Sequence, residues 1–183
     1  WTELGLWREV SKQPGGKVKG KSGRMYSRTP YRGWIMKVDP STGKITPWAS
    51  GFRSPNGLGY DAEGRLYVTD NQGDWRGTSP LHHVEKGKFY GHPASLPWTE
   101  GYDGPAPLEI PVADLEKMRT PAAIWFTQGS MANSPTQPIL IPEGFGPFAG
   151  QLLVGEMNRA RYRYQVHRQA PAKDLARERL RRW

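Results

Sequence analysis

Short apolar and β-branched runs alternate along the chain with clusters of Gly, Pro, Asn and Asp. Residues 57–60 and 65–69 are two such runs, and Asp61-Ala-Glu-Gly64 between them has the composition of a tight turn. Further runs of the same kind lie at 24–28, 33–39, 44–49 and 80–84. Their length and their turn residues predict β-hairpins rather than helices.

An internal repeat indicates how these hairpins are arranged. Gly23-Arg-Met-Tyr26 and Gly64-Arg-Leu-Tyr67 start 41 residues apart, within the range of about 40–50 residues typical of β-propeller blades. A third copy, Gly150-Gln-Leu-Leu-Val-Gly-Glu156, starts 86 residues later, an interval that holds either two repeats or one repeat with an insertion. We favour the insertion, because Pro97 to Pro121 is rich in Pro, Gly and charge and has no copy of the motif.

The predicted fold class is therefore all-β, a partial β-propeller of the six-bladed type with about two to three blades. In the second blade we expect 87–93 to follow the strand at 80–84 and to close the blade through a turn. The 22 Gly, the 17 Pro and a mean hydropathy of −0.73 agree with many short strands joined by turns.

Composition also restricts function. No apolar run is long enough to span a bilayer, so we expect no transmembrane segment. Residue 1 is Trp rather than Met and no signal peptide is visible, so we expect a piece of a longer protein. Cys is absent, which excludes disulfides, thiolate metal sites and Cys catalysis within these 183 residues.

The net charge of +9 is concentrated at one end of the chain. Residues 159–183 hold nine Lys and Arg against Asp174 and Glu178, so they carry seven of the nine net charges. A near-neutral body argues against a nucleic-acid groove. We predict a partial propeller domain at 1–158 and a basic, Arg-rich tail at 159–183. That tail is either a helix around 172–182 or a non-native segment produced by a shifted reading frame.

Polar residues crowd the end of the strand at 65–69. Asp70, Asn71 and Gln72 are poor strand formers but good hydrogen-bonding groups, so they mark a turn or a site. Asp74, Trp75 and Arg76 follow, in either a channel mouth or an ordinary polar loop. His82 and His83 are neighbours on a predicted strand and therefore face opposite sides of it, which prevents both from entering one site.

Four segments, in this order and spacing, resemble the glucose/sorbosone dehydrogenase family of six-bladed propellers. They are Gly51-Phe-Arg-Ser-Pro-Asn-Gly-Leu58, Gly64-Arg-Leu-Tyr-Val-Thr-Asp-Asn71, Gly87-Lys-Phe-Tyr-Gly-His-Pro93 and Gly146-Pro-Phe-Ala-Gly-Gln-Leu-Leu-Val-Gly-Glu156. The resemblance implies a periplasmic or extracellular quinoprotein that oxidises a sugar or aldehyde. Its cofactor would be pyrroloquinoline quinone (PQQ), held at the channel mouth by Ca²⁺.

The resemblance also implies a set of cofactor-binding residues: Arg53, Ser54, Asn71, Gln72 and Gly73. Arg53 falls where the family has an Arg that contacts the quinone, and a planar cation suits the carboxylates and quinone oxygens. Ser54 stands where Asn is usual. Gln72 and Gly73 would ligate Ca²⁺ through their backbone carbonyls, although the usual Gly-Pro pair is absent. The general-base His belongs to an upstream blade, so no catalytic residue is assigned.

Two other functions stay open. Ser54-Pro-Asn-Gly-Leu58 also resembles the metal loop of gluconolactonase-like propellers, in which Asn56 would bind a divalent ion that polarises a lactone. A non-catalytic propeller that binds carbohydrate or protein is the third interpretation, because a fold does not transfer activity. For the oxidoreductase, a cytochrome c-type heme domain is the expected electron acceptor. It would lie outside this chain, which has no Cys-x-x-Cys-His motif.

Overall fold

The structure, a computed structural model, describes residues 30–73, 76–157 and 164–166. These residues form two compact units. The first takes in 30–53, 73, 76–77 and 85–120, and the second takes in 54–72, 78–84, 121–157 and 164–166. The predicted strand at 24–28, the first copy of the repeat and the predicted helix at 172–182 lie outside the described residues.

The first unit contains a two-stranded antiparallel sheet of β1 (Trp34–Val38) and β2 (Ile45–Ser50), which confirms the hairpin predicted there. The turn between the strands is set by Asp39, whose Oδ1 accepts the backbone N–H groups of Ser41 at 2.8 Å and Thr42 at 3.3 Å. The turn ends at Gly43 with φ +68, a conformation that glycine adopts without a Cβ penalty.

The rest of the first unit is mostly non-strand. It includes the 3₁₀ helix η2 (Pro93–Trp98) and the α-helix α2 (Val112–Met118). Their apolar residues share a core with the segment before them, made of Phe89, Ala94, Leu96, Ile110 and Leu115. A buried cluster of this kind holds the segment between residues 85 and 120 together without a sheet.

Residues 87–93 do not close the second blade as we expected. The N–H of Ser50 donates to the carbonyl of Lys88 at 3.0 Å, and the N–H of Tyr90 donates to the carbonyl of Ser50 at 2.8 Å. The segment therefore satisfies the backbone groups at the end of β2, which turn composition alone could not reveal.

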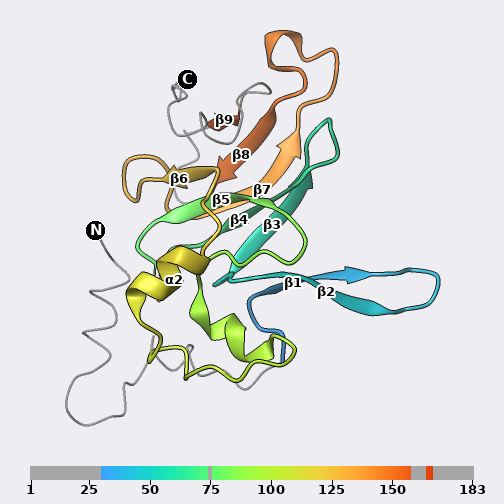
Figure 1. The fold of residues 1–183 in the computed structure, drawn as a ribbon. Helices are drawn as coiled ribbons and strands as arrows, with labels where there is room; N and C mark the ends of the chain where they lie inside the picture. Colours follow the sequence, from blue (N-terminus) through green and yellow to red (C-terminus); the bar gives the residue numbers. More distant parts are fainter. Residues whose placement is uncertain (1–29, 74–75, 158–163, 167–183) are drawn as a thin grey trace. The chain divides into compact units, whose positions relative to one another are not determined.

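The second unit begins with a four-stranded antiparallel sheet in the order β3-β4-β5-β6 (Figure 1). Its strands are β3 (Pro55–Tyr60), β4 (Leu66–Asp70), β5 (Ser79–Val84) and β6 (Ile124–Phe126). β6 is the strand that pairs with the outer side of β5, so residues 85–123 interrupt one sheet. The 86-residue interval thus contains one blade with an insertion, as predicted.

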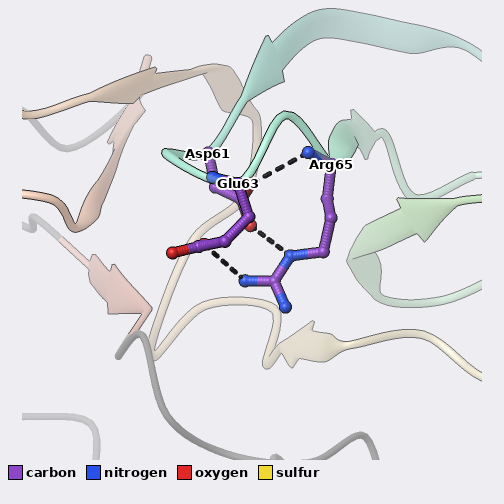
Figure 2. Close-up of polar contacts among 3 residues, drawn as sticks. All are labelled: Asp61, Glu63 and Arg65. Carbon is purple, nitrogen blue, oxygen red and sulfur yellow. Dashed lines mark hydrogen bonds and ion pairs between the residues drawn. The ribbon is translucent and has the colours of Figure 1, made fainter.

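The turn between β3 and β4 is fixed by a short polar network (Figure 2). Oδ1 of Asp61 accepts the backbone N–H groups of Glu63 at 3.1 Å and Arg65 at 2.9 Å. The Arg65 guanidinium bonds Oδ2 of Asp61 at 2.5 Å and Oε2 of Glu63 at 2.9 Å. The predicted turn at 61–64 is confirmed.

A second sheet has the order β7-β8-β9 (Figure 1). It consists of β7 (Pro135–Leu140), β8 (Leu152–Glu156) and β9 (Tyr164–Val166), with the 3₁₀ turn η3 (Gly146–Phe148) between β7 and β8. β9 lies within the basic segment 159–183. The two copies of the repeat correspond in structure, because β4 begins two residues after Gly64 and β8 begins two residues after Gly150.

The two sheets pack through their first strands. A Cβ added to Gly59 would collide with the carbonyl of Pro138, and one added to Gly57 would meet the backbone and side chain of Gln137. Only glycine allows β3 to approach β7 so closely. The second unit also contains a buried cluster of Tyr67, Leu81, Phe126, Ala132, Leu152 and Val154.

Candidate functional site

Within the second unit, a buried carboxylate organises the end of β4. Oδ1 of Asp70 accepts the N–H of Ser54 at 2.7 Å and the N–H of Asn71 at 2.9 Å. The N–H of Asn71 also approaches the carbonyl of Ser54 at 3.4 Å. A carboxylate bond to backbone N–H is among the stronger hydrogen bonds in proteins. Two predicted cofactor residues, Ser54 and Asn71, are thus held at fixed places beside each other.

The end of β8 repeats this arrangement. Oε1 of Glu156 accepts the N–H groups of Asn133 at 3.2 Å and Ser134 at 3.3 Å, and the N–H of Met157 bonds the carbonyl of Ser134 at 3.1 Å. The hydroxyl of Ser134 lies 3.2 Å from Oδ1 of Asn71, which joins the two strand ends. This pairing was not predicted from the sequence, although Ser-Pro occurs at the start of both β3 and β7, at 54–55 and 134–135.

Gln72 belongs to the same network. Its backbone N–H donates to the hydroxyl of Ser79 at 3.1 Å, and that hydroxyl lies 3.4 Å from the carbonyl of Asn133. Ser54, Asn71 and Gln72 are therefore brought together in the second unit by backbone and side-chain hydrogen bonds. None of these bonds uses the Gln72 carbonyl, the group expected to face a metal ion.

The first unit holds the other two predicted residues, Arg53 and Gly73. A Cβ built on Gly73 would collide with the Arg53 guanidinium, so this side chain lies directly on the glycine backbone. Gly73 has φ +140, a conformation that other residues rarely adopt. Arg53 and Gly73 are therefore neighbours in the structure, and the positive φ shows why position 73 favours glycine.

The loop after Gly73 turns back at Arg76. The N–H of Gly73 donates to the carbonyl of Arg76 at 2.6 Å, and the N–H of Arg76 donates to the carbonyl of Gly73 at 2.8 Å. A carbonyl oxygen has two lone pairs, so the one on Gly73 retains a site for a second partner such as a metal ion. A carbonyl next to a guanidinium is a donor set that fits a cofactor with both carboxylates and a bound cation.

Arg76 does not lie in an ordinary exposed loop, one of the two interpretations of this segment. It is 7% exposed, and its Nη2 donates to the carbonyls of Tyr90 at 2.5 Å and Gly51 at 3.3 Å. The same Nη2 would lie 3.5 Å from a Cβ added to Gly91. Its neighbours Asp74 and Trp75 lie outside the described residues.

The backbone before Arg53 is held by an aromatic pair. The rings of Phe52 and Tyr90 stack with centroids 5.1 Å apart, and both side chains are buried. The hydroxyl of Tyr90 accepts the N–H of Glu85 at 2.8 Å. Burial raises the pKa of Tyr90 to about 12, so the ring is neutral at physiological pH. This pair fixes the point from which the Arg53 side chain leaves the backbone.

The two adjacent histidines face opposite sides of β5, as predicted. His82 is buried, whereas His83 is half-buried and packs on the ring of Tyr67 at 5.3 Å. Among residues 30–73, 76–157 and 164–166, no three His, Asp or Glu side chains gather where they could hold a metal ion. The Nδ2 of Asn56, the expected lactonase ligand, donates to the carbonyl of Pro135 at 2.8 Å.

No helix in the described part of the chain is long and apolar enough to cross a membrane.

Residues 11–182 match the family described as Glucose / Sorbosone dehydrogenase. The PQQ-bound aldose sugar dehydrogenase of Streptomyces coelicolor is similar in structure, with a TM-score of 0.52 and 17% identity over 82% of this chain and 39% of that one. A glucose dehydrogenase crystal structure also has a TM-score of 0.52, with 13% identity over 83% of this chain and 46% of that one. No curated protein matches the chain.

These likenesses confirm the predicted propeller fold. The chain spans about two fifths of the length of the Streptomyces coelicolor structure. What it forms is therefore part of a propeller, as the incomplete set of sheets among the described residues indicates.

Proposed function

Because the chain belongs to the glucose/sorbosone dehydrogenase family, we propose that its protein oxidises a sugar or aldehyde with PQQ. The observation that carries this proposal is the contact between the Arg53 guanidinium and Gly73, beside a carbonyl that retains a lone pair. This contact presents a cationic hydrogen-bond donor and a neutral oxygen ligand within one unit. Similarity to a PQQ-bound structure supports the choice of cofactor.

Each residue of the candidate site has a role in the proposal. Arg53 binds carboxylate or quinone oxygens through charge-assisted hydrogen bonds. Gln72 and Gly73 offer backbone carbonyls to Ca²⁺, which takes oxygen ligands of this kind. The family resemblance adds Ser54 and Asn71, whose backbone N–H groups bond Asp70 in the second unit. When bound, PQQ supplies a two-electron acceptor, which amino-acid side chains do not offer.

Electrostatic repulsion makes the binding of Ca²⁺ and the binding of PQQ depend on each other. The Arg53 guanidinium lies on Gly73, so a divalent cation at the Gly73 carbonyl would face a like charge nearby. A ligand with carboxylates removes that repulsion because it pairs with both cations. The protein should therefore bind Ca²⁺ weakly alone and more tightly with PQQ, and thermodynamic linkage requires the reverse enhancement as well.

The substrate, compartment and electron acceptor complete the proposal. An aldose or a related aldehyde is the substrate class, in keeping with the aldose sugar dehydrogenase and the glucose dehydrogenase whose structures are similar. We place the protein in the periplasm or outside the cell, with a cytochrome c-type protein or domain as electron acceptor. The general base that takes the substrate proton lies in a part of the propeller outside the sites assigned here.

Turnover tests the proposal. The full-length protein is reconstituted with PQQ and Ca²⁺, and reduction of an artificial dye is followed with a panel of aldoses and aldehydes. We expect substrate-dependent dye reduction that Arg53→Ala lowers by at least about tenfold at limiting PQQ, from the loss of a charged hydrogen bond. Arg65→Gln, which removes an equal charge from the β3–β4 turn, should retain activity. Absence of dye reduction with every substrate would contradict the proposal.

A further inference from the structure

Arg76 joins three separate segments of the first unit. Its backbone N–H and carbonyl both form hydrogen bonds with the backbone of Gly73. Its side chain donates to the carbonyls of Gly51 and Tyr90. Gly51 lies two residues before Arg53, and Gly73 is the residue on which the Arg53 guanidinium lies. Arg76 thus bonds both the backbone just before Arg53 and the backbone of Gly73, on which the Arg53 guanidinium lies.

The glycines around Arg76 show how closely these segments pack. A Cβ on Gly51 would collide with the backbone nitrogen of Tyr90, and a Cβ on Gly91 would lie 2.6 Å from Cδ of Arg119. Gly51 and Gly91 have φ +92 and +102, so their conformations also favour glycine. A long, buried side chain whose partners are backbone carbonyls sets the spacing between segments, because a carbonyl cannot move without its peptide unit.

We propose that Arg76 is a positioning residue for the cofactor contact: it holds Arg53 against Gly73 without touching the cofactor itself. This inference rests on the proposed function, since it concerns the geometry of the same site. The planar guanidinium suits the role because one nitrogen serves two carbonyls while the head group stays charged. Lys carries three N–H donors on one nitrogen but lacks the planar guanidinium, whose rigid fork fixes the direction of each donor.

A double-mutant cycle separates positioning from general support of the fold. PQQ is titrated into the full-length protein with saturating Ca²⁺, and its dissociation constant is measured by fluorescence quenching for wild type, Arg53→Ala, Arg76→Gln, Arg76→Lys and Arg53→Ala/Arg76→Gln. Thermal unfolding of the cofactor-free proteins is recorded in parallel. Arg65→Gln is the control for loss of one guanidinium from another loop.

If Arg76 acts through Arg53, Arg76→Gln weakens PQQ binding about tenfold in the wild-type background and less than about twofold when Arg53 is already Ala. Arg76→Lys should fall between wild type and Arg76→Gln. A purely structural role predicts instead the same loss in both backgrounds, and this result would overturn the proposal. So would wild-type affinity in Arg76→Gln, or failure of both Arg76 variants to fold. If wild type itself does not bind PQQ, the proposed function fails, and this inference fails with it.

Discussion

The Arg53 guanidinium lies so close to Gly73 that the glycine has no room for a side chain. Gly73→Ala should therefore displace the guanidinium and weaken PQQ binding by at least about tenfold, because a charged hydrogen bond depends on its position. The measurement is a PQQ titration of the full-length protein.

Gly43→Ala is the matched control. Gly43 also has positive φ, but nothing lies within 4 Å of the position its Cβ would take. Gly43→Ala should therefore lower the melting temperature through backbone strain and leave the affinity for PQQ unchanged. Equal affinities for PQQ in Gly73→Ala and wild type would show that the contact does not matter for the cofactor.

Loss of the buried Asp70 carboxylate should lower the free energy of unfolding more than loss of an exposed carboxylate that accepts a similar pair of hydrogen bonds. Asp70 is fully buried, and Asp70→Ala leaves the N–H groups of Ser54 and Asn71 without their carboxylate acceptor, so we expect a loss of about 1–3 kcal/mol in the free energy of unfolding. Chemical denaturation of the full-length protein measures it. Asp39→Ala removes a similar pair of bonds from an exposed turn, where water replaces the carboxylate, and should cost less. The reverse order would contradict the role given to burial.

The approach of β3 to β7 gives a third prediction. Gly59→Ala pushes a methyl group into the backbone of Pro138, which should destabilise the fold by about 1–3 kcal/mol through overpacking. Leu58→Ala, at an exposed position of the same strand, should cost less. Denaturation curves of the two variants make the comparison. If both variants are equally stable, the strands are less closely packed than the structure shows.

Calcium removal should act through the cofactor. Because Arg53 disfavours a second cation at Gly73 in the absence of an anion, PQQ should raise the affinity for Ca²⁺, and chelation should weaken PQQ binding by about the same factor. Calorimetric titrations of each component with and without the other test this. Independent binding would indicate that the ion lies away from Arg53.

Alkaline pH should destabilise the first unit through Tyr90. Burial raises the pKa of its hydroxyl to about 12, against about 10 for an unfolded chain. Between these values the unfolded state loses its proton first, so stability is complete below about pH 10 and falls as the pH rises toward about 12. Tyr90→Phe should flatten, without abolishing, the slope of unfolding free energy against pH, because burial also raises the pKa of Tyr67. An unchanged slope in Tyr90→Phe would contradict this assignment.

Local sequence predicted the hairpins well because their determinants are local. The turn at Asp61 is built from contacts within four residues, and the β1–β2 turn from contacts within five. The repeat from Gly64 to Gly150 also reflected real structural correspondence. Such elements are specified by side chains close to one another in the chain.

Long-range pairing was beyond the sequence. β6 is three residues long, and it pairs with β5 through residues far apart in the sequence, such as Leu81 and Ile124. The links from Arg76 to the carbonyls of Gly51 and Tyr90 leave no side-chain pattern, since any residue provides a carbonyl. The family resemblance placed Arg53 and Gly73 in one site, and only the structure shows the contact between them.

One measurement addresses the central claim, that Arg53 on Gly73 forms a place for an anionic quinone. PQQ is titrated into the full-length protein with Ca²⁺ present, and its dissociation constant is compared among wild type, Arg53→Ala and Arg65→Gln. We predict saturable binding by wild type and Arg65→Gln, with affinity at least about tenfold weaker in Arg53→Ala. No saturable binding by wild type, or equal affinity in wild type and Arg53→Ala, would contradict the claim.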